Sequence, residues 1–172
     1  DIDLYEIAPY IIGNFGPISI EAELLYGYGT AQRDGAADSD IKIWGFYGEG
    51  GYDFGPFGLQ VGVAFGSGDN DGYGPGNDIE SALLLQDLGD WDKLFHLTDK
   101  DGGMMAGFTN HVALGTSSNL LAVMGGLEIF YLSGDFAATD NITIGGIVAQ
   151  VNIMEPMAGM NDDYGMEYDL SL

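Results

Sequence analysis

The feature that most constrains the fold is a long period-two alternation of apolar and polar residues. In 18–28 every even position is apolar, whereas the odd positions include Ser19, Glu21 and Glu23. The same alternation recurs in three further segments: 41–54, 57–65 and 164–172. Successive side chains of a β-strand point to opposite faces, so this pattern predicts strands with one apolar and one polar face. Helical periodicity is nearly absent, and the expected fold class is therefore all-β.

Weaker alternation in other parts of the chain brings the expected number of strands to seven. The additional segments are about 3–14, 120–136 and 142–153. The expected strands are roughly 9–16 residues long, compared with about 5–6 residues in ordinary soluble sheets. Tilted strands that cross a bilayer need about 9–11 residues. Strand length therefore favours a sheet that spans a membrane.

The connections between the expected strands are unequal in length. Three are tight and contain Asn-Phe or Asp-Phe: 14–17, 53–56 and 135–141. The others are long and polar: 29–40, 67–119 and 154–163. In an antiparallel meander alternate connections lie at the same end, so all tight turns are expected at one end. Transmembrane barrels combine short periplasmic turns, long external loops and interfacial aromatic residues. Phe15, Phe54 and Phe136 are therefore predicted to lie at the membrane interface.

Composition limits the classes of partner. The chain has 27 acidic and 4 basic residues, a formal net charge of -23, and no cysteine. This charge argues against nucleic acid or an anionic membrane surface as a partner. A hydrophobic content of 46% is too high for a disordered acidic chain. We therefore expect a folded protein that attracts cations.

The acidic residues of the expected strands lie on the faces opposite the apolar ones. Carboxylates facing lipid are costly, whereas carboxylates facing a water-filled lumen are not. A negative lumen concentrates cations. We therefore predict a pore lined by Glu21, Glu23, Glu49, Asp53, Glu167 and Asp169.

Several segments carry a resemblance to a known family. They read YGEGGYDFGPFGLQVGVAFGSGDNDG at 47–72, DWDKLF at 90–95, TDNITIGG at 139–146 and YGMEYDLSL at 164–172. Over about 41–172 the chain resembles outer-membrane porins of deltaproteobacterial type, which are related in style to the alginate-export barrels. The resemblance implies an antiparallel transmembrane β-barrel of 16–18 strands in the outer membrane of a Gram-negative bacterium. It also implies passive diffusion of small hydrophilic solutes or ions, contact with outer-membrane lipid and lipopolysaccharide, and a homotrimer.

Two features depart from that family pattern. Seven strands cannot close such a barrel, so residues 1–172 are expected to be a single partial barrel domain with a long external loop at 67–119. Alginate exporters are expected to line their pore with arginines, but Arg33 is the only arginine of this chain. Small solutes or cations are therefore expected in place of alginate.

Two alternative functions stay open. One is a barrel that serves as a sheath or scaffold for another component, such as an electron-transfer partner. The other is a soluble, acidic β-sandwich that binds its target with calcium. Detergent-free solubility would favour the second alternative.

A calcium loop is the one metal site that the spacing suggests. Asp69, Asp71 and Asp78 occupy positions at which such a loop supplies oxygen ligands, and Gly72 stands at its sixth position. No other cofactor is expected. His96 and His111 stand alone, and the signatures of serine hydrolases and P-loops are absent. The protein is therefore not expected to be an enzyme.

Overall fold

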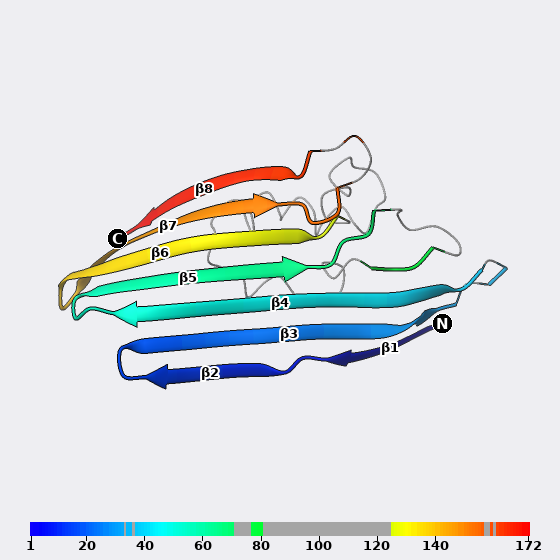
Figure 1. Ribbon diagram of the computed structural model, residues 1–172, viewed down its shortest axis with the longest axis horizontal. Coiled ribbons are helices and arrows are strands. Elements are labelled where there is room, and N and C mark those ends of the chain that lie inside the picture. Colours follow the sequence, from blue (N-terminus) through cyan, green and yellow to red (C-terminus); the bar gives the residue numbers. More distant parts are fainter. Residues whose placement is uncertain (33, 36, 71–76, 81–124, 157–158, 160) are drawn as a thin grey trace.

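The computed structural model describes residues 1–32, 34–35, 37–70, 77–80, 125–156, 159 and 161–172. All regular secondary structure in this part of the chain is β-strand, as the alternation predicts. The strands are β1 (Ile2–Ile7), β2 (Tyr10–Phe15), β3 (Ile18–Ala31), β4 (Ser39–Asp53), β5 (Phe57–Gly66), β6 (Leu127–Thr139), β7 (Ile142–Asn152) and β8 (Asp163–Ser171). They form one antiparallel sheet in the order β1-β3-β4-β5-β6-β7-β8, and β2 also pairs with β3 (Figure 1).

The tight turns lie together at one end of the sheet, as predicted. They connect β2 to β3, β4 to β5 and β6 to β7, whereas the long connections leave from the other end (Figure 1). Gly16 and Gly55 occupy the first two turns with φ of 65° and 77°. This left-handed backbone is strained for residues with a Cβ, so glycine permits the tight reversal. A proline with fixed φ follows each glycine and further restricts the turn.

The first predicted strand is interrupted, which explains why the sheet has eight strands and not seven. β1 and β2 both pair with β3, and Ala8 and Pro9 lie between them. Proline has no N–H to donate to a ladder and is confined to edges and irregular positions in sheets. The Pro9 carbonyl still accepts a hydrogen bond from the Leu24 amide at 3.0 Å. The two pieces therefore form one edge.

The turn between β6 and β7 lies later in the chain than predicted. β6 continues to Thr139 and β7 begins at Ile142, so the tight turn is made by 140–141. Phe136 therefore lies inside β6, directly opposite Phe57 of β5. The prediction that Phe136 opens the turn is wrong, because the ladder with β7 continues past it through a register shift at Ala137. Residues 120–124 of the predicted strand lie outside the described part.

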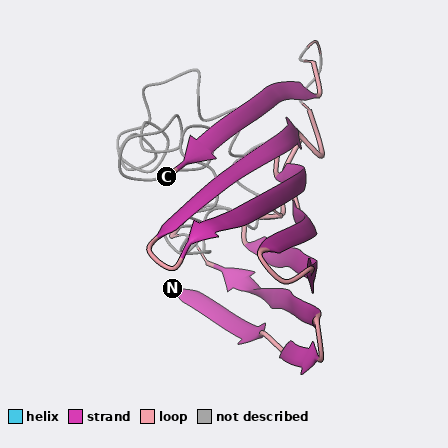
Figure 2. Ribbon diagram, turned by 90° about the vertical axis from the view of Figure 1, so that its left-hand side faces the viewer, coloured by secondary structure: helices cyan, strands magenta, loops and turns pink. Residues whose placement is uncertain are grey.

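The sheet is open. In the described part of the chain, β1 and β2 form one edge and β8 forms the other. The sheet is twisted and curved (Figure 2), but these residues do not close it into a barrel. The expected closure is therefore not reached within this sheet. Each edge presents backbone groups that can pair with another strand.

The two faces of the sheet differ in chemistry. The face that we call the apolar face exposes large hydrophobic side chains from every strand. They include Ile7, Phe15, Ile18, Ile20, Leu24, Tyr26, Tyr28, Trp44, Tyr52, Leu59, Val61, Phe130, Leu132, Phe136, Ile144, Tyr168 and Leu170. Charged residues on this face, among the described strands, are Asp3, Asp40, Lys42, Glu128 and Asp163, near the long connections. The apolar face is therefore uncharged from that rim to the tight turns.

The opposite face, which we call the acidic face, is divided into two halves in β3–β8. Five of its carboxylates lie in the half nearer the tight turns, whereas two lie near the middle of β8. The five are Glu21, Glu23, Glu49, Asp53 and Asp135, and the two are Glu167 and Asp169. The half nearer the long connections is apolar and buried. There Ala31, Ile41 and Ile43 form a cluster, against which Leu4 and Ile79 pack. Burial of these side chains stabilises the sheet at the end where the loops leave.

Candidate functional site

Three of the predicted pore-lining carboxylates share one row across the acidic face. The row runs from β3 to β8 in the order Glu21, Glu49, Gly62, Tyr131, Ala149 and Glu167. Glu21 and Glu49 are directly opposite each other, an arrangement that is destabilising for like charges unless solvent or a cation offsets it. Glu167 is buried, and it lies four strands from Glu49. At about 4.8 Å per strand, that separation is about 19 Å along the sheet.

The other predicted carboxylates lie in neighbouring rows. Glu23 is one row nearer the long connections, opposite Tyr47. Asp169 is one row nearer the tight turns, and Asp53 lies at the end of β4, where it faces Gly58. All six predicted residues are thus on one face. Glu21, Glu23 and Glu49 form a group on β3 and β4, whereas Glu167 and Asp169 lie apart on β8.

Two tyrosines connect to this row by hydrogen bonds. The Tyr131 hydroxyl donates a hydrogen bond to Glu49 Oε2, and the Tyr47 and Tyr131 hydroxyls are 3.2 Å apart. The Tyr131 side chain is buried and covers Gly62, where an added Cβ would overlap the tyrosine ring. Glycine at this position therefore lets Tyr131 reach across β5 to β4. A hydrogen bond to a charged group contributes about 1.5–3 kcal/mol, so this contact holds the Glu49 carboxylate in place.

The sequence prediction missed several polar residues of the acidic face. Tyr47 and Gln60 follow the same alternation as Glu49 and were identifiable from it. Alternation alone does not assign the facing of β6, because Glu128 alternates in phase with Phe130. The register places Glu128 at the rim, where Asn152 Nδ2 donates a hydrogen bond to its Oε2 at 3.1 Å. As a result, Tyr131, Ser133 and Asp135 belong to the acidic face.

The predicted interfacial aromatics lie toward the tight-turn end. Phe15 ends β2 and is exposed, and Phe54 lies in the next turn with its ring centroid 4.5 Å from that of Tyr52. Phe136 stacks on Phe57 with a centroid distance of 4.6 Å. These contacts gather aromatic side chains near one end of the apolar face. Their position at a membrane interface remains a prediction.

Two of the three predicted calcium ligands, Asp69 and Asp78, lie in the described residues. The Asp78 carboxylate forms an ion pair with Lys42, with 2.9 Å between Asp78 Oδ2 and Lys42 Nζ. Asp69 is buried, and Asp71 lies outside the described residues. Where the structure describes the chain, no group of three or more potential metal ligands is found. His96 and His111 also lie outside the described part.

A second group of acidic residues lies in the long connections. Glu155 follows β7, and its amide donates a hydrogen bond to the Gly125 carbonyl at 2.8 Å. Burial raises the pKa of Glu155 above its ordinary value, and the charges of Glu80 and Asp69 raise this pKa further. The folded protein therefore disfavours the ionised form of Glu155.

Replacing Glu155 by glutamine is expected to raise the thermal stability at about neutral pH, by about 1–2 °C for a partly solvated group. Because the folded-state pKa lies above the ordinary value of 4.5, folding favours the protonated form. The contribution of Glu155 to folding stability is fully present at pH values below that ordinary pKa, and it is lost as pH rises through the raised pKa. The difference between variant and wild type should therefore grow over this window. Thermal unfolding at several pH values measures it, and a pH-independent difference would contradict the assignment.

Comparison with known proteins adds no relative: no family model, curated protein or solved structure matches the chain. In the described residues, no helix has the length and apolar character needed to cross a membrane. The chemical difference between the apolar face and the acidic face is therefore the main indication of function.

Proposed function

We propose that the chain forms part of an outer-membrane porin of a Gram-negative bacterium. The sheet would be one arc of a transmembrane β-barrel through which small hydrophilic solutes or ions diffuse. The apolar face would contact lipid and the acidic face would line a water-filled lumen. The observation that carries this proposal is the separation of two faces. The exposed apolar face is uncharged between its rim and the tight turns, whereas the opposite face of the described strands holds eight carboxylates, including Glu6 of β1.

The dimensions of the apolar face support the proposal. From Ile18 to Tyr28 the apolar positions of β3 continue without a charge. Ten residue steps of about 3.4 Å give about 34 Å along the strand. A strand tilted by about 35–45° would then cover about 24–28 Å of membrane, close to the apolar band of about 25 Å in outer-membrane barrels. A soluble protein rarely exposes an apolar surface that large without a partner.

The open edges place a requirement on the proposal. Backbone groups within a bilayer must all be paired, so a spanning sheet has to close. β1 with β2, and also β8, must therefore each pair with a further strand in the membrane. The proposal is thus a statement about a larger barrel, to which this sheet contributes eight strands.

Planar-bilayer recordings under a salt gradient test the pore directly. We expect stepwise conductance with a reversal potential that indicates cation preference, because the lumen would carry a negative potential. No conductance, together with solubility in the absence of detergent, would overturn the proposal. That result would favour the soluble acidic β-sandwich.

Neutralising Glu21 and Glu49 together to glutamine is expected to reduce the cation-to-anion permeability ratio several-fold, because it removes two facing charges from the lumen. The reversal potential under the same salt gradient measures this ratio. The matched control is Glu128→Gln, which neutralises a glutamate on the opposite face of the sheet. An equal shift in the control, or no shift in the double variant, would remove Glu21 and Glu49 from the pore lining.

A further inference from the structure

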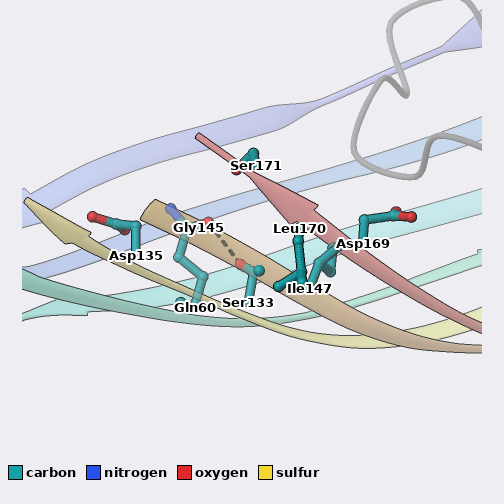
Figure 3. Close-up of a pocket in the computed structure, with 10 residues that line it drawn as sticks. Gln60, Ser133, Asp135, Gly145, Ile147, Asp169, Leu170 and Ser171 are labelled. Carbon is teal, nitrogen blue, oxygen red and sulfur yellow. Dashed lines mark hydrogen bonds between the residues drawn. The ribbon is translucent and has the colours of Figure 1, made fainter. Parts of the chain in front are cut away.

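A groove of about 250 Å³ lies on the acidic face near the tight turns. It is formed by β5, β6, β7 and β8 (Figure 3). Its side chains include Gln60, Ser133, Asp135, Ile147, Asp169 and Ser171. The volume is below the roughly 300–1,000 Å³ of pockets for drug-sized ligands. The groove therefore suits a small or narrow solute.

Gly145 opens the floor of the groove. It lies on the acidic face between Asp135 and Ser171 in register, and it presents only backbone there. The Ser171 hydroxyl leans over Gly145, where an added Cβ would lie 2.7 Å from Ser171 Oγ. Asp135 leans the other way, over Gly58 on β5. The floor between these two side chains is therefore left open.

The side of the groove formed by β5 and β6 is polar and ordered. Ser133 Oγ donates a hydrogen bond to Gln60 Oε1 at 3.2 Å, which orients the Gln60 amide (Figure 3). Ile147 adds aliphatic surface beside it. A ligand in the groove would therefore contact hydrogen-bonding side chains and, next to them, an aliphatic side chain.

The two ends of the groove are negatively charged. Asp135 lies on β6 and Asp169 on β8, with Gly145 and Ile147 of β7 between them (Figure 3). Asp135 is in register with Gly145 of β7, and Gly145 is in register with Ser171 of β8. Ser171 lies two residues after Asp169. Two strand spacings and two residue steps separate the aspartate backbones by about 12 Å. Among the residues that the structure describes, no basic side chain lines the groove.

We propose that this groove binds an elongated organic dication, such as an aliphatic diamine or polyamine. One amino group would bind Asp135 and the other Asp169, through charge-assisted hydrogen bonds. The inference rests on the proposed porin function, because it names the class of solute that the lumen would take up.

Other small ligands fit the groove less well. One metal ion needs several oxygen ligands at about 2.3–2.6 Å, and two carboxylates so far apart cannot both reach it. An anion would be repelled by both aspartates. A neutral polyol could bond to Gln60 and Ser133 on one side of the groove but gains nothing from the charges of the two aspartates. The arrangement of charge therefore selects a cation with two separated amino groups.

Calorimetric titration of the detergent-solubilised protein tests the proposal with probes of equal charge. We expect 1,8-diaminooctane to bind more tightly than 1,3-diaminopropane, which is too short to reach both aspartates. Asp135→Asn and Asp169→Asn should each weaken binding of the long diamine about fivefold, the effect of losing one exposed ion pair. Each variant should also abolish the preference for the longer probe. The matched control is Asp53→Asn, which removes a carboxylate at the same end of the sheet but outside the groove.

The outcomes separate this inference from the proposed function. Equal binding of both diamines, a length preference that survives in both variants, or equally tight binding of sorbitol would overturn the groove assignment. Conductance in bilayers without selective diamine binding would support the porin function and reject the diamine site. Selective diamine binding without conductance would support the diamine site and reject the porin function.

Discussion

Replacing Val61 by lysine is expected to destabilise the protein folded in a bilayer by about 2–4 kcal/mol. Val61 is 58% exposed on the apolar face, opposite Gly50 on one side and Leu132 on the other. This row is apolar from β3 to β8 and lies away from the charged rim, so a lysine there could not easily reach water. Refolding from urea into lipid vesicles measures the change.

The matched control for this prediction is the neighbouring substitution Gln60→Lys. Gln60 lies on the acidic face, where a lysine would join the carboxylates of that face and would cost little beyond the hydrogen bond from Ser133. We therefore expect a change of less than about 1 kcal/mol for the control. Equal effects of the two substitutions would mean that lipid does not cover the apolar face.

Replacing Gly62 by alanine is expected to destabilise the protein by about 2–4 kcal/mol. An added Cβ would overlap the Tyr131 ring, so the ring would have to move away from β5. Moving it breaks the hydrogen bond to Glu49 and separates the Tyr131 and Tyr47 hydroxyls. The Glu49 carboxylate would then lose its donor while it still faces Glu21. Equilibrium unfolding in urea measures the loss.

The matched control for the glycine is Gly50→Ala in the neighbouring strand. Nothing lies within 4 Å of a Cβ at Gly50, so the added methyl group meets open space. Because glycine in a strand costs about 0.5–1 kcal/mol relative to alanine, this variant should be neutral or slightly stabilised. A similar destabilisation of both variants would show that the Tyr131 contact contributes nothing specific.

The hydrogen bond from Tyr131 to Glu49 can also be tested by its effect on the proposed pore. Tyr131→Phe keeps the ring over Gly62 but removes the donor to Glu49. In the proposed pore, the Glu49 carboxylate would then no longer be held by this donor. We therefore expect a reversal potential that differs from wild type under the same salt gradient, and a smaller loss of stability than in Gly62→Ala because the ring is kept. An unchanged reversal potential would confine Tyr131 to a packing role.

The alternation alone predicted much of the fold. In 18–28 it identified a strand, its apolar side and the side that carries Glu21 and Glu23, because side-chain direction in a strand depends only on local geometry. The unequal connections predicted the tight turns at one end. Both features are local in sequence, and the structure bears them out in β3, β4 and β5.

What the sequence left undecided depends on which strands become neighbours. The break at Pro9, the continuation of β6 past Phe136 and the facing of Tyr131 all follow from ladder pairing. So does the row that joins Glu21, Glu49 and Glu167, whose members lie far apart in the chain. Alternation assigns each residue to a face, but only the register decides which residues meet across that face. Register is set by pairing and side-chain fit between strands, and these exist only in the folded sheet.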